Sequence, residues 1–152
     1  MAKRIISIGA DHGGFLLKEI LKKALKEWGY KVEDEGVYSD KACDYPIFGF
    51  NVAKKVSSKE AYRGIVICKT GIGMSVIANK LPGVRAGLCH TIEDALSARQ
   101  HNDTNVLALS AKKNSKKKAV NIVKTWLETK ALKGRHARRV RKIKEFEKKV
   151  FK

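Results

Sequence analysis

Short apolar runs alternate along the chain with longer segments in which apolar residues recur every three or four positions. A short, continuous apolar run is typical of a strand buried on both faces, whereas recurrence at every third or fourth residue is typical of an amphipathic helix. The pattern predicts strands at 4–10, 30–36, 64–67, 84–89 and 106–109, and helices at 15–28, 44–56, 74–81, 92–100, 115–130 and 135–149.

The order of these elements indicates the fold class. Strands that alternate with helices form a parallel sheet with helices on both faces. A chain of 152 residues without internal repeats fits one such unit. We therefore predict an α/β protein in which residues 1–152 form one three-layer, doubly wound domain. Its sheet should be five-stranded, parallel and Rossmann-like, and a strongly basic helix should begin at about residue 135.

Polar residues follow two of the predicted strands. Asp11 and His12 come after the first strand, and Cys68 comes after the third. Right-handed crossovers place every strand-to-helix loop of a parallel sheet at one edge, where ligands bind in open sheets. These residues should therefore share a crevice. His101 and Asn102 follow a helix instead, so they should lie at the opposite edge of the same subunit.

The segment C-K-T-G-I-G at 68–73 has the composition of a ligand-binding loop. Glycines let backbone N–H groups converge on an anion where Cβ atoms would intrude. The loop is therefore a candidate anion cradle with Cys68 facing into it. In the alternative interpretation, Cys68 packs as a small apolar residue and the glycines only form a turn.

Composition narrows the class of protein. Apolar residues make up 43% of the chain, and no stretch approaches the ~20 apolar residues that a membrane helix needs. The N-terminus has no signal peptide pattern, which favours a cytoplasmic protein. Its three cysteines, Cys43, Cys68 and Cys89, show no C-x-x-C spacing, so we expect reduced thiols and neither a disulfide framework nor a metal site.

Positive charge gathers at the C-terminal end. Residues 112–152 hold 17 Lys and Arg against 3 acids, so 17 − 3 = +14 of the formal net charge of +18 lies there. Such an end attracts nucleic acid, a membrane surface or a phosphorylated metabolite, or it is simply a solvated helix face. Nucleic-acid binders interleave aromatic and basic residues. After residue 111 the only aromatics are Trp126, Phe146 and Phe151, which makes nucleic-acid binding the less favoured interpretation.

Several motifs together resemble one family. They are G-A-D-H-G-G-F-x-L-K-E (9–19), D-Y-P (44–46), I-C-x-T-G-I-G-M-S (67–75), A-N-K (78–80), R-A-G-L-C (85–89), R-Q-H-N-D-T-N-V-L (99–107) and G-R-H-x-R-R-V (134–140). In this order, over about residues 4–145, they resemble the type B ribose-5-phosphate isomerases, a family that includes the galactose-6-phosphate isomerase subunits. Each motif is short, but the ordered set is specific.

The resemblance implies an aldose–ketose isomerase that converts ribose 5-phosphate and ribulose 5-phosphate through an enediolate, without metal or organic cofactor. Cys68 is then the base, and the backbone N–H groups of Lys69, Gly71, Ile72 and Gly73 form the anion hole, with the hydroxyl of Thr70 in the same loop. The resemblance also implies that His101 and Asp11 open the sugar ring. It implies that His12, Arg135 and Arg139 bind the phosphate and that Asn102 and Tyr45 contact the sugar.

Arg135 and Arg139 lie four residues apart, so on a helix they share a face and can clamp one phosphate. The chain departs from the family pattern at two positions. Lys69 stands where the family usually has glycine, and Lys112 stands where it commonly has an arginine that touches phosphate. Lysine at 69 strains the backbone only if φ is positive there, and lysine at 112 keeps the charge but loses the bidentate geometry.

Two further expectations concern the substrate and the partner. A six-carbon sugar phosphate, such as allose 6-phosphate or galactose 6-phosphate, remains an alternative, and so does a catalytically silent subunit of a hetero-oligomer. Because Cys68 and His101 should lie at opposite edges of one subunit, one site can contain both only if two subunits contribute. We expect a homodimer with shared active sites, with further pairing into a tetramer left open.

Overall fold

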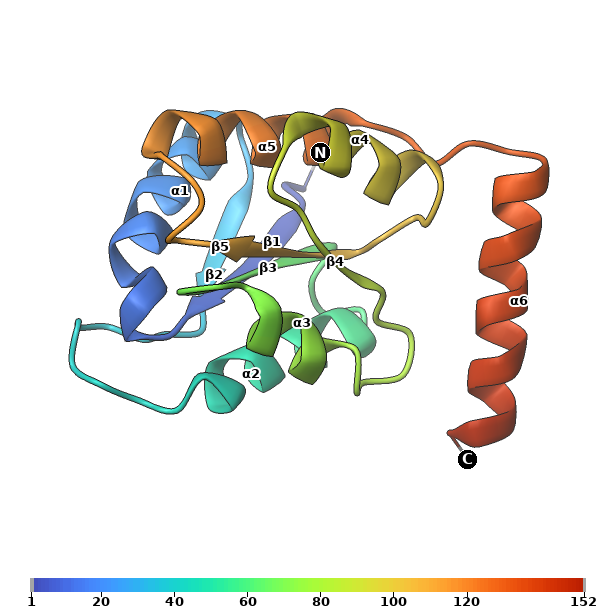
Figure 1. Ribbon diagram of the computed structural model, residues 1–152, viewed down its shortest axis with the longest axis horizontal. Coiled ribbons are helices and arrows are strands. Elements are labelled where there is room, and N and C mark those ends of the chain that lie inside the picture. The colour runs from blue at the N-terminus through green and yellow to red at the C-terminus, as the bar shows by residue number, and fades with distance from the viewer. Residues whose placement is uncertain (1, 152) are drawn as a thin grey trace.

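The computed structural model describes residues 2–151 and contains the predicted alternation of strands and helices (Figure 1). The elements are β1 (Ile5–Ala10), the 3-10 turn η1 (His12–Gly14), α1 (Phe15–Glu27), β2 (Lys31–Asp34), α2 (Tyr45–Ser57), β3 (Arg63–Cys68), α3 (Ile72–Ala78), β4 (Ala86–Leu88), α4 (Ile92–Gln100), β5 (Val106–Ser110), α5 (Lys116–Glu128) and α6 (Arg135–Val150).

All neighbouring strands pair in parallel, in the order β2-β1-β3-β5-β4. The chain moves outward from β1 to β2 and then returns to place β3 on the other side of β1. The strand order therefore reverses between β1 and β3. In open α/β sheets, ligands bind at the carboxyl ends of the two strands that flank such a reversal.

Two apolar cores cover the faces of the sheet, and β3 contributes to both because its side chains alternate. Ile65 and Ile67 pack in the core under α1, α4 and α5, whereas Val66 and Cys68 pack in the core over α2 and α3. Figure 1 shows these two helix layers above and below the sheet. The predicted doubly wound α/β fold with a five-stranded parallel sheet is confirmed.

Two predicted elements have different ends for physical reasons. The helix expected at 74–81 begins at Ile72, directly after Gly71, whose φ of 78° starts the helix from the left-handed region. It ends before Asn79, whose side chain accepts from the Ala86 amide (2.8 Å) and donates to the Ala86 carbonyl (3.1 Å). These bonds occupy the outer edge of β4 at its first residue, and β4 is shorter than the strand predicted at 84–89.

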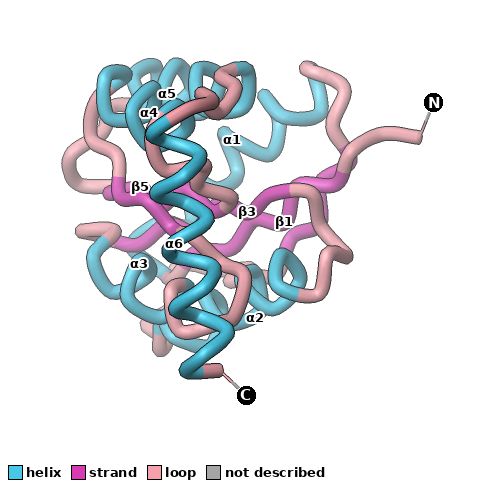
Figure 2. Tube along the Cα trace, turned by 90° about the vertical axis from the view of Figure 1, so that its right-hand side faces the viewer, coloured by secondary structure: helices cyan, strands magenta, loops and turns pink. Residues whose placement is uncertain are grey.

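Helix α6 stands outside the three layers. Figure 2 shows it running across the edge of the layers, from the side of α4 and α5 toward the side of α2 and α3. Of its described residues only Val140 is buried. Near its C-terminal end, the Gly83 amide donates to Glu147 Oε1 at 2.8 Å. Across residues 2–151, no helix combines the length and the apolar character that a membrane span requires.

Candidate active site

The loops after β1 and β3 lie side by side, as the sequence predicts. Asp11 is buried, and its Oδ1 accepts from the amides of Gly13 (2.9 Å) and Gly14 (3.2 Å), which shapes the turn that begins α1. A Cβ placed on Gly13 would lie 3.3 Å from the Lys69 amide nitrogen. The turn that carries Asp11 and the loop that begins at Cys68 are therefore in contact at the reversal point of the sheet.

Cys68 ends β3 with its sulfur directed at the glycine loop. Its side chain is 5% exposed, and Sγ accepts a hydrogen bond from the Gly71 amide at 3.1 Å. Thr70 is exposed, and its hydroxyl oxygen accepts from the Ile72 amide at 3.2 Å. These contacts hold the thiol and the hydroxyl on the same short loop, where α3 begins.

Lys69 causes no backbone strain in this loop. Among the described residues, the non-glycine residues with positive φ are Lys59 and Asp103, so position 69 does not need glycine for its conformation. The Lys69 carbonyl accepts from the Ser110 hydroxyl (2.7 Å) and from the Lys112 amide (3.0 Å). Lys112 is therefore brought beside the glycine loop by the segment that follows β5.

His12 and Tyr45 complete this side of the crevice. The Cys43 amide donates to His12 Nδ1 at 3.2 Å, which places the ring proton of a neutral His12 on Nε2. Tyr45 begins α2, and its ring lies over the glycine loop, because a Cβ added to Gly73 would meet Tyr45 Cζ at 2.6 Å. A glycine at 73 is thus required for Tyr45 to lie here.

The other two cysteines differ from Cys68 in position. Cys89 is buried after β4, and burial, together with the carboxylate of Asp94, raises its pKa to about 12. At neutral pH it is a protonated thiol and a poor base. Cys43 is half-buried in the segment before α2, with Sγ 3.8 Å from His12 Nδ1. Cys68 is therefore the thiol at the glycine loop.

His101 and Asn102 lie at the opposite edge of the sheet, as predicted. His101 is the C-cap of α4, where its amide donates to the Ser97 carbonyl at 2.8 Å. A few residues later, Asn105 accepts from the Gly64 amide and donates to the Arg85 carbonyl, both at 3.0 Å. These bonds join the amino-terminal ends of β3, β4 and β5, which are far along the strands from Cys68.

Arg99 holds this turn in place. It is 5% exposed, and its guanidinium donates to the Thr129 carbonyl (3.1 Å), to Asp103 Oδ1 (2.8 Å) and to the Thr104 carbonyl (2.6 Å). Asp103 adopts a φ of 45°, a left-handed conformation that aspartate tolerates better than most residues. The His101 turn is thereby tied to the segment that leads into α6.

The first turns of α6 bring Arg135 and Arg139 to this same edge. Both arginines are exposed and one turn apart. Between them, the His136 ring stacks on the His101 ring with centroids 4.3 Å apart and planes 12° apart. No sequence pattern predicts this contact, because the two histidines are 35 positions apart and come from the end of α4 and from α6.

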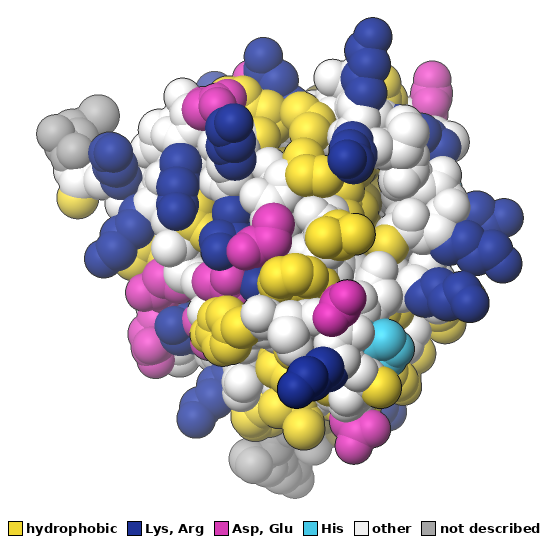
Figure 3. Space-filling view, turned by 90° about the vertical axis from the view of Figure 1, so that its left-hand side faces the viewer, with side chains coloured by type: hydrophobic (Ala, Val, Ile, Leu, Met, Phe, Trp, Pro, Cys, Tyr) yellow, Lys and Arg dark blue, Asp and Glu magenta, His cyan; other side chains and the backbone are white. Residues whose placement is uncertain are grey.

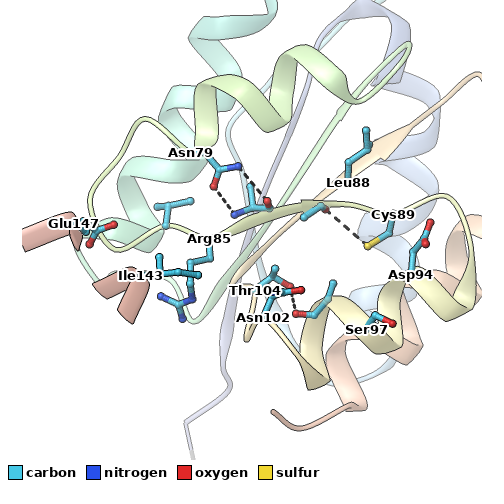
Figure 4. Close-up of a pocket in the computed structure, with 14 residues that line it drawn as sticks. Asn79, Arg85, Leu88, Cys89, Asp94, Ser97, Asn102, Thr104, Ile143 and Glu147 are labelled. Atoms are coloured by element: carbon cyan, nitrogen blue, oxygen red, sulfur yellow. Dashed lines mark hydrogen bonds between the residues drawn. The ribbon is translucent and has the colours of Figure 1, made fainter. Parts of the chain in front are cut away.

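A cavity of about 520 Å³ separates β4 and α4 from α6 (Figure 4). Asn102 lines it together with Arg85 and, from α6, Ile143 and Glu147. A second cavity, of about 230 Å³, is lined by His101 and His136. The predicted site residues thus form two groups at opposite edges of one subunit. The first holds Asp11, His12, Tyr45, Cys68 to Gly73 and Lys112, and the second holds His101, Asn102, Arg135 and Arg139.

The aromatic residues after position 111 differ in exposure: Phe146 and Phe151 are exposed, whereas Trp126 is not. Trp126, one of the three aromatic residues after position 111, is fully buried and cannot stack on a base. Figure 3 shows the side of the molecule away from α6, where lysine and arginine side chains are dispersed among acidic and apolar ones. Basic charge is therefore spread over the surface as well as gathered on α6.

Comparisons with known proteins agree with this architecture. The model of the family described as Ribose/Galactose Isomerase matches residues 6–143. The chain is 42% identical over 142 residues to ribose-5-phosphate isomerase B of Escherichia coli, which covers 93% of this chain and 95% of that one. The structure superposes on ribose-5-phosphate isomerase B of Clostridium thermocellum with a TM-score of 0.93 and 49% identity, covering 96% and 99% of the two chains. It superposes equally well, with a TM-score of 0.93 and 40% identity over 97% and 99%, on the Mycoplasma genitalium enzyme with bound ribulose-5-phosphate.

Proposed function

Because the chain belongs to the ribose/galactose isomerase family, we propose that it interconverts ribose 5-phosphate and ribulose 5-phosphate through an enediolate, without metal or organic cofactor. The observation that carries this proposal is the Cys68 sulfur, bonded at 3.1 Å to the Gly71 amide beside the Asp11 turn. The relative with bound ribulose-5-phosphate supports the choice of substrate.

In the proposed reaction Cys68 is the base. Isomerisation removes a weakly acidic proton beside the carbonyl and returns it to the adjacent carbon, so one group that accepts and then donates a proton is sufficient. Negative charge develops on the substrate oxygen as the proton leaves. The amides from Lys69 to Gly73 and the Thr70 hydroxyl would stabilise this enediolate, because dipoles fixed by the fold need no reorganisation during the reaction.

The remaining residues open the ring and bind the substrate. His101 and Asp11 move protons to and from the ring oxygen and the anomeric hydroxyl. His12, Arg135, Arg139 and Lys112 bind the phosphate, and Asn102 and Tyr45 contact the sugar hydroxyls. Because these residues divide between the two edges of the sheet, each site needs the first group from one subunit and the second group from another.

We therefore also propose a homodimer with two shared sites. Exposed apolar side chains support a partner: Ile72 (58%) and Val76 (55%) share a face of α3 next to the glycine loop, and Phe146 (62%) and Val150 (73%) share a face of α6. The open space between α6 and β4 adds a concave surface that a second copy can fill (Figure 4). An isologous interface repeats each of these contacts.

The direct test is an isomerase assay on the purified protein with ribose 5-phosphate, allose 6-phosphate and galactose 6-phosphate. We expect the highest kcat/KM with ribose 5-phosphate. A higher kcat/KM with allose 6-phosphate or galactose 6-phosphate would instead make the protein an isomerase of six-carbon sugar phosphates. Absence of turnover with all three would reject the isomerase activity.

Replacing His101 separates ring opening from proton abstraction. His101→Ala should slow conversion of ribose 5-phosphate by about 10²-fold, a usual loss for a general acid–base residue. Ribulose 5-phosphate cannot close a five-membered ring, because its 5-hydroxyl carries the phosphate. Exchange of its C1 proton with deuterium oxide, followed by NMR, should therefore stay close to the wild-type rate. Equal losses in turnover and exchange would contradict the ring-opening role.

Lys112 provides a gain-of-affinity prediction. Lys112→Arg should lower KM for ribose 5-phosphate by about 3- to 10-fold, because a planar guanidinium binds a phosphate through two hydrogen bonds where an ammonium acts as a point charge. Steady-state kinetics measure the change. Lys113→Arg is the matched control, since Lys113 is the adjacent exposed lysine, and it should leave KM unchanged. An equal effect of the two substitutions would argue against a phosphate contact at 112.

A further inference from the structure

We propose that His136 is a positioning residue for His101, because the stack of their rings fixes the imidazole of the ring-opening residue against the helix that carries Arg135 and Arg139. The inference rests on the proposed role of His101. The two rings are almost parallel, 12° apart in plane and 4.3 Å apart at their centroids. They come from different elements, one from the end of α4 and one from the first turn of α6.

The stack is the contact that orients the His101 ring. The backbone at this position is fixed, since the His101 amide bonds to Ser97 and Arg99 holds the two residues that follow Asn102. The side chain itself is exposed. Within residues 2–151, no hydrogen bond to a ring nitrogen of His101 is found, so both nitrogens are free for substrate. An exposed imidazole with a fixed backbone still rotates about two side-chain bonds, and the His136 face removes that freedom.

Charge around the pair disfavours protonation of His136. The pKa of His136 is lowered by partial burial first and then by His101, Arg135 and Arg139. Two imidazolium rings at this separation repel each other, so the pair holds one proton more readily than two. The charges around His136 therefore make it the less suitable of the two rings to exchange a proton with the substrate.

The other charged groups around the pair do not reverse this preference. From the turn after α4, Asp103 is already bonded to Arg99 at 2.8 Å and to Arg85 at 3.4 Å. From α6, Arg141 and Lys144 line the adjoining cavity and are both cations. The nearby carboxylate is therefore occupied by arginines, and the remaining groups disfavour a second positive charge on His136.

This arrangement joins phosphate binding to ring opening. His136 lies between the two arginines proposed to bind phosphate, on the first turns of α6. Because its ring stacks on His101, the position of α6 determines the position of the His101 ring. Placement of α6 against a bound phosphate would then also place His101 against the sugar ring. His136 lies inside the motif G-R-H-x-R-R-V, and the proposed phosphate role of the two arginines gives this histidine no part.

The experiment compares His136→Ala, which removes the stack, with His136→Phe, which keeps an aromatic face and removes the titrating group. The chain has only four histidines, so imidazole ¹⁵N–¹H NMR spectra of the labelled full-length protein can be assigned with single substitutions. Arg138→Ala is the matched control, because Arg138 is an exposed cation on the same turn of α6. Turnover of ribose 5-phosphate and deuterium exchange into ribulose 5-phosphate are measured on each variant.

We expect His136→Ala to shift the His101 resonances and to lower ribose 5-phosphate turnover by about 10-fold, with deuterium exchange unchanged. His136→Phe should restore turnover to within about 3-fold of wild type. In His101→Phe, the titration midpoint of His136 should rise, since the ring that lowers its pKa is gone. Arg138→Ala should match wild type in every measurement.

Three outcomes would overturn the inference. They are unchanged His101 resonances in His136→Ala, equal turnover in the Ala and Phe variants of His136, and a titration midpoint of His136 that is the same in His101→Phe as in wild type. Failure of the proposed function has a different signature. If the isomerase activity is absent, the wild-type protein converts none of the three sugar phosphates; if only the role of His101 is wrong, His101→Ala converts ribose 5-phosphate normally. In both cases the NMR coupling of the two rings would persist.

Discussion

Replacing the Cys68 thiol with a hydroxyl should lower kcat for ribose 5-phosphate by at least about 10²-fold while KM changes little. A serine hydroxyl is far less acidic than a thiol, so at neutral pH it is a poor acceptor and donor for the carbon-bound proton. The substitution keeps the size of the residue and its place at the glycine loop, so substrate binding should persist. Steady-state kinetics of Cys68→Ser with ribose 5-phosphate measure both constants.

Deuterium exchange distinguishes this loss from a ring-opening defect. Cys68→Ser should abolish exchange of the C1 proton of ribulose 5-phosphate, whereas His101→Ala should retain it. Cys43→Ser is the matched control, because its backbone amide still donates to His12 and its thiol has no proposed role. We expect this control to turn over like wild type. A Cys68→Ser enzyme with near wild-type kcat would reject Cys68 as the base.

The strand-end part of the site was predictable because it depends on topology. Parallel strands bring the segments after β1 and β3 to one edge, and Asp11 and Cys68 directly follow those strands. The same rule predicted His101 at the other edge. The structure agrees, because nearby Asn105 makes backbone hydrogen bonds to Gly64 and Arg85 at the amino-terminal ends of the strands. Topology was sufficient here, since neither placement depends on how distant side chains pack.

Contacts between distant segments were not predictable from the sequence. The Cys43 amide donates to His12 Nδ1 although the two residues are 31 positions apart, and Cys43 lies in the stretch 35–44, which has no helix or strand. The His101–His136 stack depends on the course of the chain between α5 and α6, which residues 129–134 determine without periodicity. Lysine in place of the family glycine strains the backbone only if φ is positive there, and the sequence does not determine φ; the structure shows that φ at position 69 is not positive.

Pairs of inactive subunits should recover activity if each site is shared. In a heterodimer of Cys68→Ser and His101→Ala chains, one site combines the intact Cys68 of one subunit with the intact His101 of the other, and the second site carries both defects. A purified heterodimer should therefore show about half of the wild-type kcat per dimer. In an equimolar mixture that exchanges freely, half of the dimers are heterodimers, so about one quarter of wild-type activity should return.

Differently tagged subunits allow the heterodimer to be isolated, and its ribose 5-phosphate turnover is compared with that of each parent homodimer. A mixture of Cys68→Ser with Cys43→Ser,Cys68→Ser chains is the matched control, since no site in it contains an intact Cys68, and it should stay inactive. Recovery in the first mixture alone requires the two edges of the sheet to meet across the interface. If isolated heterodimers show no more activity than the parents, each subunit must instead complete its own site, and the separation of His101 from Cys68 within one chain would have to be closed by movement of the α4–β5 turn and α6.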